Sequence, residues 1–122
     1  MVAISHKKKT YDRGVKAENV AALWLKLKGY KILERRYKTP VGEIDLIVRR
    51  KNIIAFVEVK ARVSKEAALE CLTFSMRERI ERAALQYISR HNIHGAQLRF
   101  DLITMSPPFK IHHLDNAWQG RA

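Results

Sequence analysis

The stretch GEIDLIVRRKNIIAFVEVKAR, residues 42–62, constrains the fold of this chain more than any other segment. Two apolar runs within it, IDLIV and IIAFVEV, have the length and composition of buried β-strands. Lys51 and Asn52 lie between the runs and predict a tight hairpin turn. The runs nevertheless carry Asp45 and Glu58 in their interiors, and Lys60 directly follows the second run, where burial of an ionisable group is costly. Any fold of this chain must therefore give these three side chains a compensating environment.

The turn predicts which residues of the two strands face each other. A two-residue loop places Arg50 opposite Ile53, and this register places Asp45 directly opposite Glu58. Because side chains alternate between the faces of a sheet, one face then carries charged residues beside Ile47 and Phe56. These charged residues are Glu43, Asp45, Glu58 and Lys60. The other face is wholly apolar, with Ile44, Leu46, Val48, Ala55, Val57 and Val59. A slip of one residue would bury the acids in the core, so the pattern fixes the register.

The predicted opposition of two carboxylates requires a positive charge between them. Carboxylates on directly opposed residues, about 5 Å apart, repel by roughly 3 kcal/mol at an effective dielectric constant near 20. Lys60 can supply part of the compensation, and a hard divalent cation supplies more, because Mg²⁺ is bound by carboxylates, waters and phosphate oxygens. Spacing alone leaves two interpretations open: a metal site, or an ion-pair cluster without chemistry.

The remaining elements predict a single α/β domain with a small mixed sheet flanked by helices. We expect an unstructured basic arm over residues 1–11, a domain over residues 12–118 and a tail over residues 119–122. Within the domain, the patterns predict a helix over 12–28, a strand over 30–38, the hairpin, a helix over 75–91, a strand over 97–105 and a short edge strand over 110–114. Residues 64–73 read as a mobile loop with a helical turn.

The first predicted helix has start and stop signals and an acidic residue on its flank. Asp12 is a candidate N-cap, and Gly29 is a candidate terminator. Its apolar residues at helical spacing are Val20, Leu23, Trp24 and Leu27. Glu18 shares a stripe with Ala21 and Leu25, so its carboxylate could reach over the end of the sheet toward Asp45. A flanking glutamate is also a common surface residue, and both interpretations stay open here.

Charge points to a polyanionic partner. Lys and Arg total 24 against 12 Asp and Glu, which gives a formal net charge of +12. Nucleic acid is the leading partner for such a chain, and an anionic membrane surface is the weaker alternative. No apolar segment approaches the ~20 residues that span a bilayer. The single cysteine, Cys71, excludes an intramolecular disulfide and suits a reducing compartment, so we expect a cytoplasmic protein.

Several basic residues are candidates for phosphate contact. They are Lys7, Lys8 and Lys9 in the N-terminal arm, Arg62 after the hairpin, and Arg77 and Arg79 near the start of the second helix. A solvated tail and a solvated helix face are the alternatives for the same residues. Ser75 and Glu78 match a capping box, which places the start of this helix at residue 75.

The motifs resemble those of a known nuclease superfamily. Asp45, followed by Glu58, Val59 and Lys60, is similar to the D…ExK signature of the PD-(D/E)XK nucleases, and Glu18 falls where the Holliday-junction-resolvase branch carries a helix-one glutamate. GEIDLI followed by FVEVKAR, and then by LRFDLI, resembles the YraN family, also called UPF0102, over residues 13–118. The chain departs from the family pattern at Ala17, where glycine is usual, and at residues 74–78.

The resemblance implies a restriction-endonuclease-like fold and a metal-dependent endonuclease. Asp45, Glu58 and the Val59 carbonyl would bind Mg²⁺ or Mn²⁺, with Glu18 supporting the site. Lys60 would orient or help deprotonate the attacking water, and Glu43 would be an accessory residue. The implied substrate is DNA, including branched or structured DNA, and the implied assembly is a homodimer. A second possibility is a nucleic-acid-binding module that keeps the nuclease scaffold without cleaving.

Overall fold

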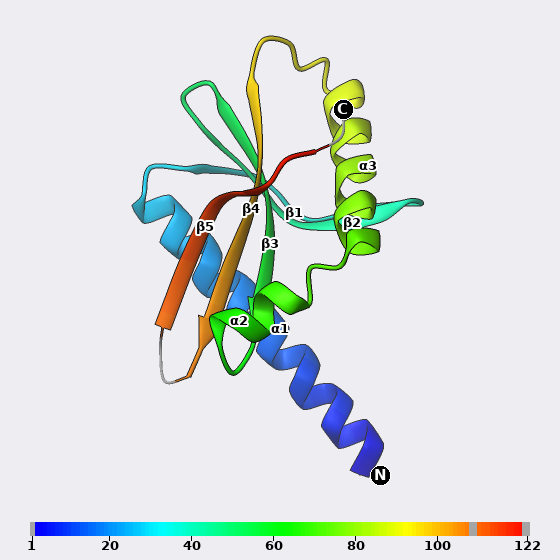
Figure 1. Ribbon diagram of the computed structural model, residues 1–122, viewed down its shortest axis with the longest axis vertical. Coiled ribbons are helices and arrows are strands. Elements are labelled where there is room, and N and C mark those ends of the chain that lie inside the picture. The colour runs from blue at the N-terminus through cyan, green and yellow to red at the C-terminus, as the bar shows by residue number, and fades with distance from the viewer. Residues whose placement is uncertain (1, 108–109, 121–122) are drawn as a thin grey trace.

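The structure, a computed structural model, describes residues 2–107 and 110–120, with side chains described from residue 14 onward. Helices lie on both faces of one sheet (Figure 1). In chain order the elements are α1 (Val2–Leu27), β1 (Lys31–Thr39), β2 (Gly42–Arg50), β3 (Ile53–Ala61), α2 (Lys65–Glu70), α3 (Phe74–Arg90), β4 (Gln97–Ser106) and β5 (Lys110–Trp118).

The sheet is mixed and follows chain order. Its five strands lie in the order β1-β2-β3-β4-β5. β3 and β4 pair in parallel, and the other neighbours pair antiparallel. The parallel step requires a crossover, which α2 and α3 provide. The predicted α/β class and mixed sheet are confirmed, and the arrangement is consistent with a restriction-endonuclease-like fold.

The predicted hairpin register is confirmed where the strands pair regularly. Arg50 lies opposite Ile53, and the pairs continue in step to Leu46 opposite Val57. Asp45 and Glu58 would form the next pair of this register, one step beyond the last regular pair. The β2–β3 ladder therefore ends where the charged residues begin.

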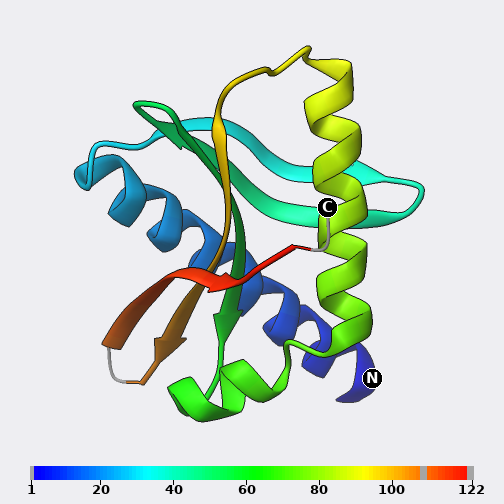
Figure 2. The same cartoon turned by 45° about the horizontal axis from the view of Figure 1, so that its top comes forward.

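Helix α1 is longer than predicted and packs on a different stripe. It begins at Val2, so residues 2–11 belong to the helix, and Asp12 is not its N-cap. The N-terminal part extends beyond the sheet (Figures 1 and 2). Gly29, with φ +91°, ends the helix as predicted, with the Tyr30 N–H donating to the Leu25 carbonyl.

The buried stripe of α1 consists mainly of small residues: Ala17, Ala21, Ala22 and Leu25. Of the predicted apolar face, Trp24 packs partly against the core, but Val20, Leu23 and Leu27 are exposed. Alanines allow the helix backbone to approach the sheet closely, so size decides the packed face more than hydrophobicity. The predicted flank position of Glu18 follows from this stripe.

The N-cap of helix α3 lies two residues before the predicted one. The Thr73 hydroxyl, not that of Ser75, accepts a hydrogen bond from the Met76 N–H, so Thr73 is the N-cap. Its buried residues recur at helical spacing and are Ile80, Ala83, Ala84 and Tyr87. The segment expected as a loop contains α2, whose N-cap is Ser64.

Two apolar clusters fill the two sides of the sheet. The α1 side contains Leu46, Val48, Ala55, Val57 and Val59, as the predicted apolar face required. The α3 side contains Ile47, Ile54 and Phe56. Ile44 was expected on the α1 side, but it packs in the α3-side cluster. Because Ile44 and Ile47 share a side while three positions apart, β2 does not alternate regularly between them.

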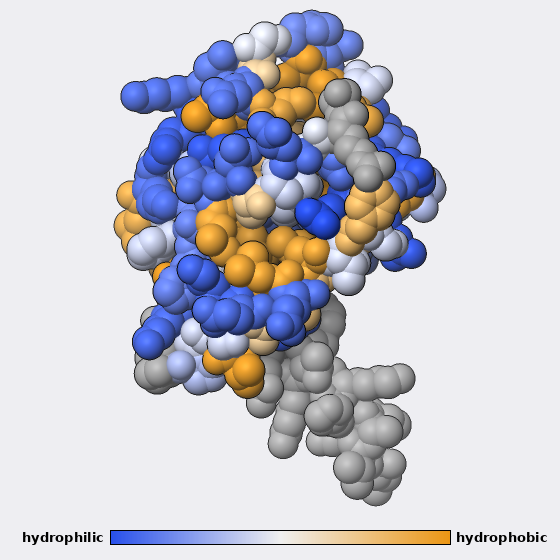
Figure 3. Space-filling view, viewed as in Figure 1, coloured by the Kyte–Doolittle hydropathy of each residue, from blue (hydrophilic) through white to orange (hydrophobic). Residues whose placement is uncertain are grey.

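β5 forms one edge of the sheet. β5 extends to Trp118, beyond the predicted short edge strand, and Trp118 is buried. Apolar patches interrupt the hydrophilic surface in Figure 3, and the exposed large apolar residues include Leu69, Phe74, Leu85 and Leu98. Over the described residues, none of the helices combines the length and the apolar character needed to cross a membrane.

Candidate active site at the open end of the β2–β3 pair

Asp45 lies where β2 leaves the regular pattern of the sheet. Arg36 and Asp45 are not among the regular β1–β2 pairs, although the residues on either side of them are paired. The regular β2–β3 pairs end at Leu46 and Val57. Arg36 itself has φ +50°, which is uncommon for a residue with a side chain. The open geometry lets the Asp45 carboxylate turn toward β3, where its Oδ2 accepts a hydrogen bond of 2.8 Å from the Val59 N–H.

Asp45 and Glu58 form a pair of carboxyl groups, of which Glu58 is buried and Asp45 is half-buried. Glu58 is only 8% exposed. Burial raises its pKa to about 8, and the neighbouring negative charge of Asp45 adds to this shift. Burial likewise raises the pKa of Asp45, although hydrogen bonds from the Val59 N–H and from Glu58 oppose the increase. Two neighbouring carboxyl groups hold one proton between them more readily than they ionise together, because the pair has too little positive charge around it.

Lys60 provides the predicted partial compensation. Its Nζ lies 3.2 Å from Glu58 Oε1, and the two side chains are 14% and 10% exposed. By contrast, no salt bridge to Asp45 is found among the side chains described in residues 14–107 and 110–120. The three residues predicted to act together are therefore brought together, with Asp45 the least compensated of them.

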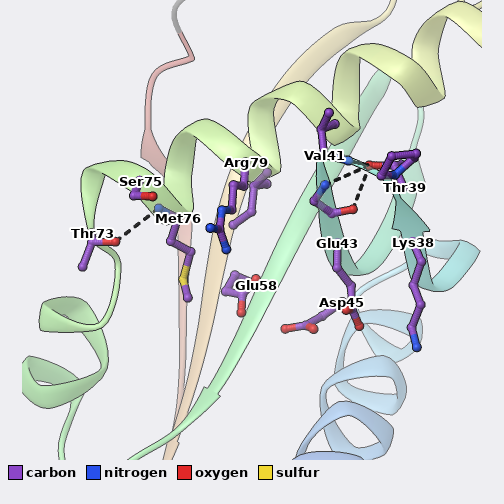
Figure 4. Close-up of a pocket in the computed structure, with 13 residues that line it drawn as sticks. Lys38, Thr39, Val41, Glu43, Asp45, Glu58, Thr73, Ser75, Met76 and Arg79 are labelled. Carbon is purple, nitrogen blue, oxygen red and sulfur yellow. Dashed lines mark hydrogen bonds between the residues drawn. The ribbon is translucent and has the colours of Figure 1, made fainter.

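A pocket of about 890 Å³ opens over the carboxyl pair. Its walls are the β1–β2 turn, β3 and the first turns of α3, and Figure 4 shows Asp45 and Glu58 below α3. Lys38 and Arg79 also line the pocket. A Cβ atom at Gly42 would lie 2.5 Å from the Arg79 carbonyl oxygen, so only glycine lets the turn and α3 meet this closely. The pocket thus combines the carboxyl pair, one member buried and one half-buried, with two basic residues.

Glu18 lies near the pair but contacts another partner. Its carboxylate accepts hydrogen bonds from Arg36 Nε at 3.1 and 3.3 Å, and Arg36 Nη2 lies 3.1 Å from Glu18 Oε2. Burial raises the pKa of Glu18, and the Asp45 and Glu43 charges raise it further, while Arg36 lowers it. Glu18 is therefore within electrostatic range of Asp45, as the stripe argument predicted, but is held by an arginine.

Glu43 does not take its predicted position. The hairpin register placed it opposite Lys60, but β2 has left β3 at this point and Glu43 pairs with Lys38 of β1. It is exposed and lines the pocket. Glu43 is thus at the rim of the site and not beside Lys60.

The predicted nucleic-acid contacts divide into three groups. The side chains of Lys7, Lys8 and Lys9 lie outside the described residues. Arg79 is exposed and lines the pocket, whereas Arg77 is partly buried and is not among the lining residues. Arg62 is exposed at the end of β3, and its Nε lies 3.3 Å from Cys71 Sγ.

Sequence reasoning missed two basic residues of the site. Lys38 directly precedes the β1–β2 turn and Glu43 directly follows it, so the turn itself predicts that these two residues lie close together. Arg36 gave no signal, because its contact with Glu18 depends on the irregular backbone of β1.

The donor atoms of the pair suit a hard divalent ion. Within residues 14–107 and 110–120, no group of three or more His, Cys, Asp or Glu side chains is arranged to hold a metal. Asp45 and Glu58 nevertheless supply two adjacent oxygen donors, and Mg²⁺ is commonly bound by one or two carboxylates together with waters and phosphate oxygens. An ion in place of the shared proton would relieve the repulsion between them.

Comparison with known proteins identifies the family. The sequence pattern described as "Uncharacterised protein family UPF0102" matches residues 17–105. A UPF0102 protein of Caulobacter sp. (strain K31) is 48% identical over 106 residues, 86% of this chain and 76% of that protein. A UPF0102 protein of Methylorubrum extorquens (strain PA1) is 45% identical over 116 residues, 94% of this chain and 91% of that protein. The chain therefore belongs to the UPF0102, or YraN, family.

Proposed function

We propose that this protein is an endonuclease that hydrolyses DNA phosphodiester bonds with the help of a divalent ion, Mg²⁺ or Mn²⁺. The observation that carries the proposal is the Asp45–Glu58 pair, with Lys60 at 3.2 Å from Glu58, under a pocket that Lys38 and Arg79 also line. A protein that only bound DNA would gain affinity by losing two carboxylates from a phosphate-binding pocket. Their presence therefore favours hydrolysis.

Each residue has a role that its position supports. Asp45 and Glu58, with the Val59 carbonyl, would hold the ion, which when bound supplies Lewis acidity toward a phosphate oxygen and lowers the pKa of bound water. The Lys60 ammonium, next to Glu58, would orient the attacking water and offset negative charge that develops on the phosphate. Glu43 would act as an accessory acid at the pocket rim.

The basic residues of the pocket support DNA as the substrate. Lys38 and Arg79 border the acids from β1 and α3, and the chain carries a net charge of +12. Cations on two sides of a pocket can bind the phosphates that flank the bond to be cleaved. The resemblance to junction resolvases makes branched or forked DNA the first substrate to test, and it suggests a homodimer because two incisions need two sites.

A cleavage assay with matched variants tests the proposal. Labelled four-way, forked, linear duplex and single-stranded DNAs are incubated with Mg²⁺ or Mn²⁺ and the wild type, Asp45→Asn or Lys60→Ala. We expect cleavage of at least one substrate by the wild type and a loss of about 10²-fold or more in both variants. Asp115→Asn, the same change at an exposed position of β5, should retain activity.

Binding measured on the same DNAs separates the two candidate functions. DNA binding by the wild type without cleavage under any of these conditions would favour a binding module with a nuclease scaffold. Cleavage that is unchanged in both Asp45→Asn and Lys60→Ala would show that the activity comes from elsewhere or from a contaminant.

A further inference from the structure

We propose that Arg36 is a positioning residue that controls how the site takes up its divalent ion. It holds the Glu18 carboxylate in an ion pair beside Asp45, and ion binding must draw Glu18 away from Arg36. This inference rests on the proposed function, because it concerns the same site. The new element is that Arg36 competes with the divalent ion for the Glu18 carboxylate.

The backbone gives the first reason to assign a role to Arg36. A residue with a side chain at φ +50° inside a strand is uncommon, and such outliers persist only where the surrounding structure maintains them. In the β1–β2 register Arg36 lies opposite Asp45, but these two residues are not among the regular pairs. The two irregularities coincide at the point where the candidate site opens.

The side-chain contacts give the second reason. Arg36 Nε lies 3.1 and 3.3 Å from the two Glu18 carboxylate oxygens, and Arg36 Nη2 lies 3.1 Å from one of them. The guanidinium therefore contacts both oxygen atoms. Glu18 is mostly buried, with 16% of its side chain exposed. A carboxylate shielded from water in this way depends on its cation partner more than a surface acid would.

The surrounding charges explain the competition. Glu58 is already next to Lys60, and Glu18 is next to Arg36, while the Asp45 carboxylate receives the Val59 N–H. A dication near Asp45 would be attracted by the Glu18 carboxylate, and Arg36 competes with it for that same carboxylate. Removal of the Arg36 charge should therefore tighten ion binding, and the gain should depend on the freed Glu18 carboxylate.

A double-mutant cycle tests this dependence without using DNA cleavage. Isothermal titration with Mg²⁺ and with Mn²⁺ is carried out on the wild type, Arg36→Gln, Glu18→Gln and the double variant. We expect Arg36→Gln to lower the Kd by about three- to tenfold. The same change in the Glu18→Gln background should lower the Kd by less than about twofold, because the competing ion pair is already gone.

Matched variants separate charge from backbone effects. Arg35→Gln is the control: Arg35 lies on the same strand and contacts the same helix through Asn19 Oδ1 at 3.0 Å, and among the side chains described from residue 14 onward it forms no ion pair with a carboxylate of that helix. Arg35→Gln should leave the Kd within about twofold. Arg36→Lys keeps the positive charge and should stay closer to the wild type than Arg36→Gln. Arg36→Gly relieves the positive φ and should match Arg36→Gln in affinity.

The outcomes distinguish this inference from the proposed function. Ion binding by the wild type that Arg36→Gln does not tighten, or tightens equally with and without Glu18, overturns the role of Arg36 and leaves the nuclease proposal standing. Tighter binding in Arg36→Gly but not in Arg36→Gln would assign the effect to the backbone and also overturn it. No ion binding by the wild type would overturn both proposals.

Discussion

Two aspartates of this protein, the half-buried Asp45 and the fully buried Asp101, have very different partners within one sheet. Each lies at an irregularity in a strand pair, and each accepts a freed backbone N–H: Asp45 from Val59 at 2.8 Å, and Asp101 from Asn116 at 2.9 Å. Asp101 additionally contacts Arg99 through two hydrogen bonds of 2.8 Å and His113 through one of 2.8 Å. Asp45 has Glu58 as its neighbour instead.

The pKa values follow from these partners. Burial alone would raise the pKa of Asp101, but the hydrogen bonds from His113, Arg99 and the Asn116 N–H together lower it. For Asp45, burial prevails and the pKa is raised. Arg99 also donates to the Tyr30 hydroxyl, so the network ties β4 to the end of α1. The fully partnered carboxylate is thus structural, whereas the partly partnered pair can accept a ligand.

The largest expected effect is the loss of the structural aspartate. Asp101→Ala leaves Arg99, which is 8% exposed, without its carboxylate partner, and should lower the free energy of unfolding by about 3–5 kcal/mol. Urea denaturation measures the change. Asp115→Ala, on neighbouring β5 and exposed, should stay within about 0.5 kcal/mol. A loss for Asp101→Ala no larger than that of Asp115→Ala would contradict the structural role.

The second expected effect is a pH dependence that comes from the carboxyl pair. The pKa of Glu58 is about 8 in the folded protein against 4.5 as its ordinary value, so the folded state binds the proton more tightly. The contribution of this group to stability is fully present below pH 4.5 and is lost as the pH rises through about 8. The slope should reach up to about 1.4 kcal/mol per pH unit.

The Glu58→Gln variant tests whether Glu58 causes the decline in the free energy of unfolding with rising pH. A glutamine cannot ionise, so the variant should lose most of the decline between about pH 5 and 8 in urea denaturation series. The lowered pKa of Asp101 acts in the opposite direction, because its stabilising contribution is lost only as the pH falls through the folded-state pKa. A decline of equal size in the wild type and in Glu58→Gln would contradict the assignment to the carboxyl pair.

The smallest expected effect disturbs the pocket wall and leaves the Asp101 network intact. A Cβ at Gly42 would lie 2.5 Å from the Arg79 carbonyl oxygen, so Gly42→Ala should force the turn away from α3 and cost about 1–3 kcal/mol. Gly14→Ala is the matched control: a Cβ there meets nothing within 4 Å, and alanine should stabilise α1 by about 0.5–1 kcal/mol. Thermal denaturation of both variants should therefore show shifts of opposite sign.

Local pattern predicted much of the fold and the centre of the site. The two-residue turn and the strict alternation of apolar positions set the β2–β3 register, which is correct from Arg50 to Leu46. The same register predicts that Asp45, Glu58 and Lys60 lie together at one end of the hairpin. Gly29 correctly ended α1, because a left-handed residue after a helix favours glycine.

The features that sequence could not provide depend on irregular backbone or on distant contacts. The departure of β2 from β3 moved Ile44 to the α3 side and Glu43 away from Lys60, and strand periodicity assumes that neither happens. Arg99 and Tyr30 lie 69 positions apart in sequence, and Arg36 and Glu18 lie 18 apart on different elements. No spacing rule links such pairs.

The central claim is that Asp45 and Glu58 form a site for a divalent ion, unlike Asp101 with its complete set of partners. Isothermal titration of Mg²⁺ and Mn²⁺ into the wild type, Asp45→Asn and Asp115→Asn tests it most directly. We predict saturable binding by the wild type and by Asp115→Asn, and binding at least about tenfold weaker in Asp45→Asn. Equal binding by all three proteins, or no binding by the wild type, would contradict the account.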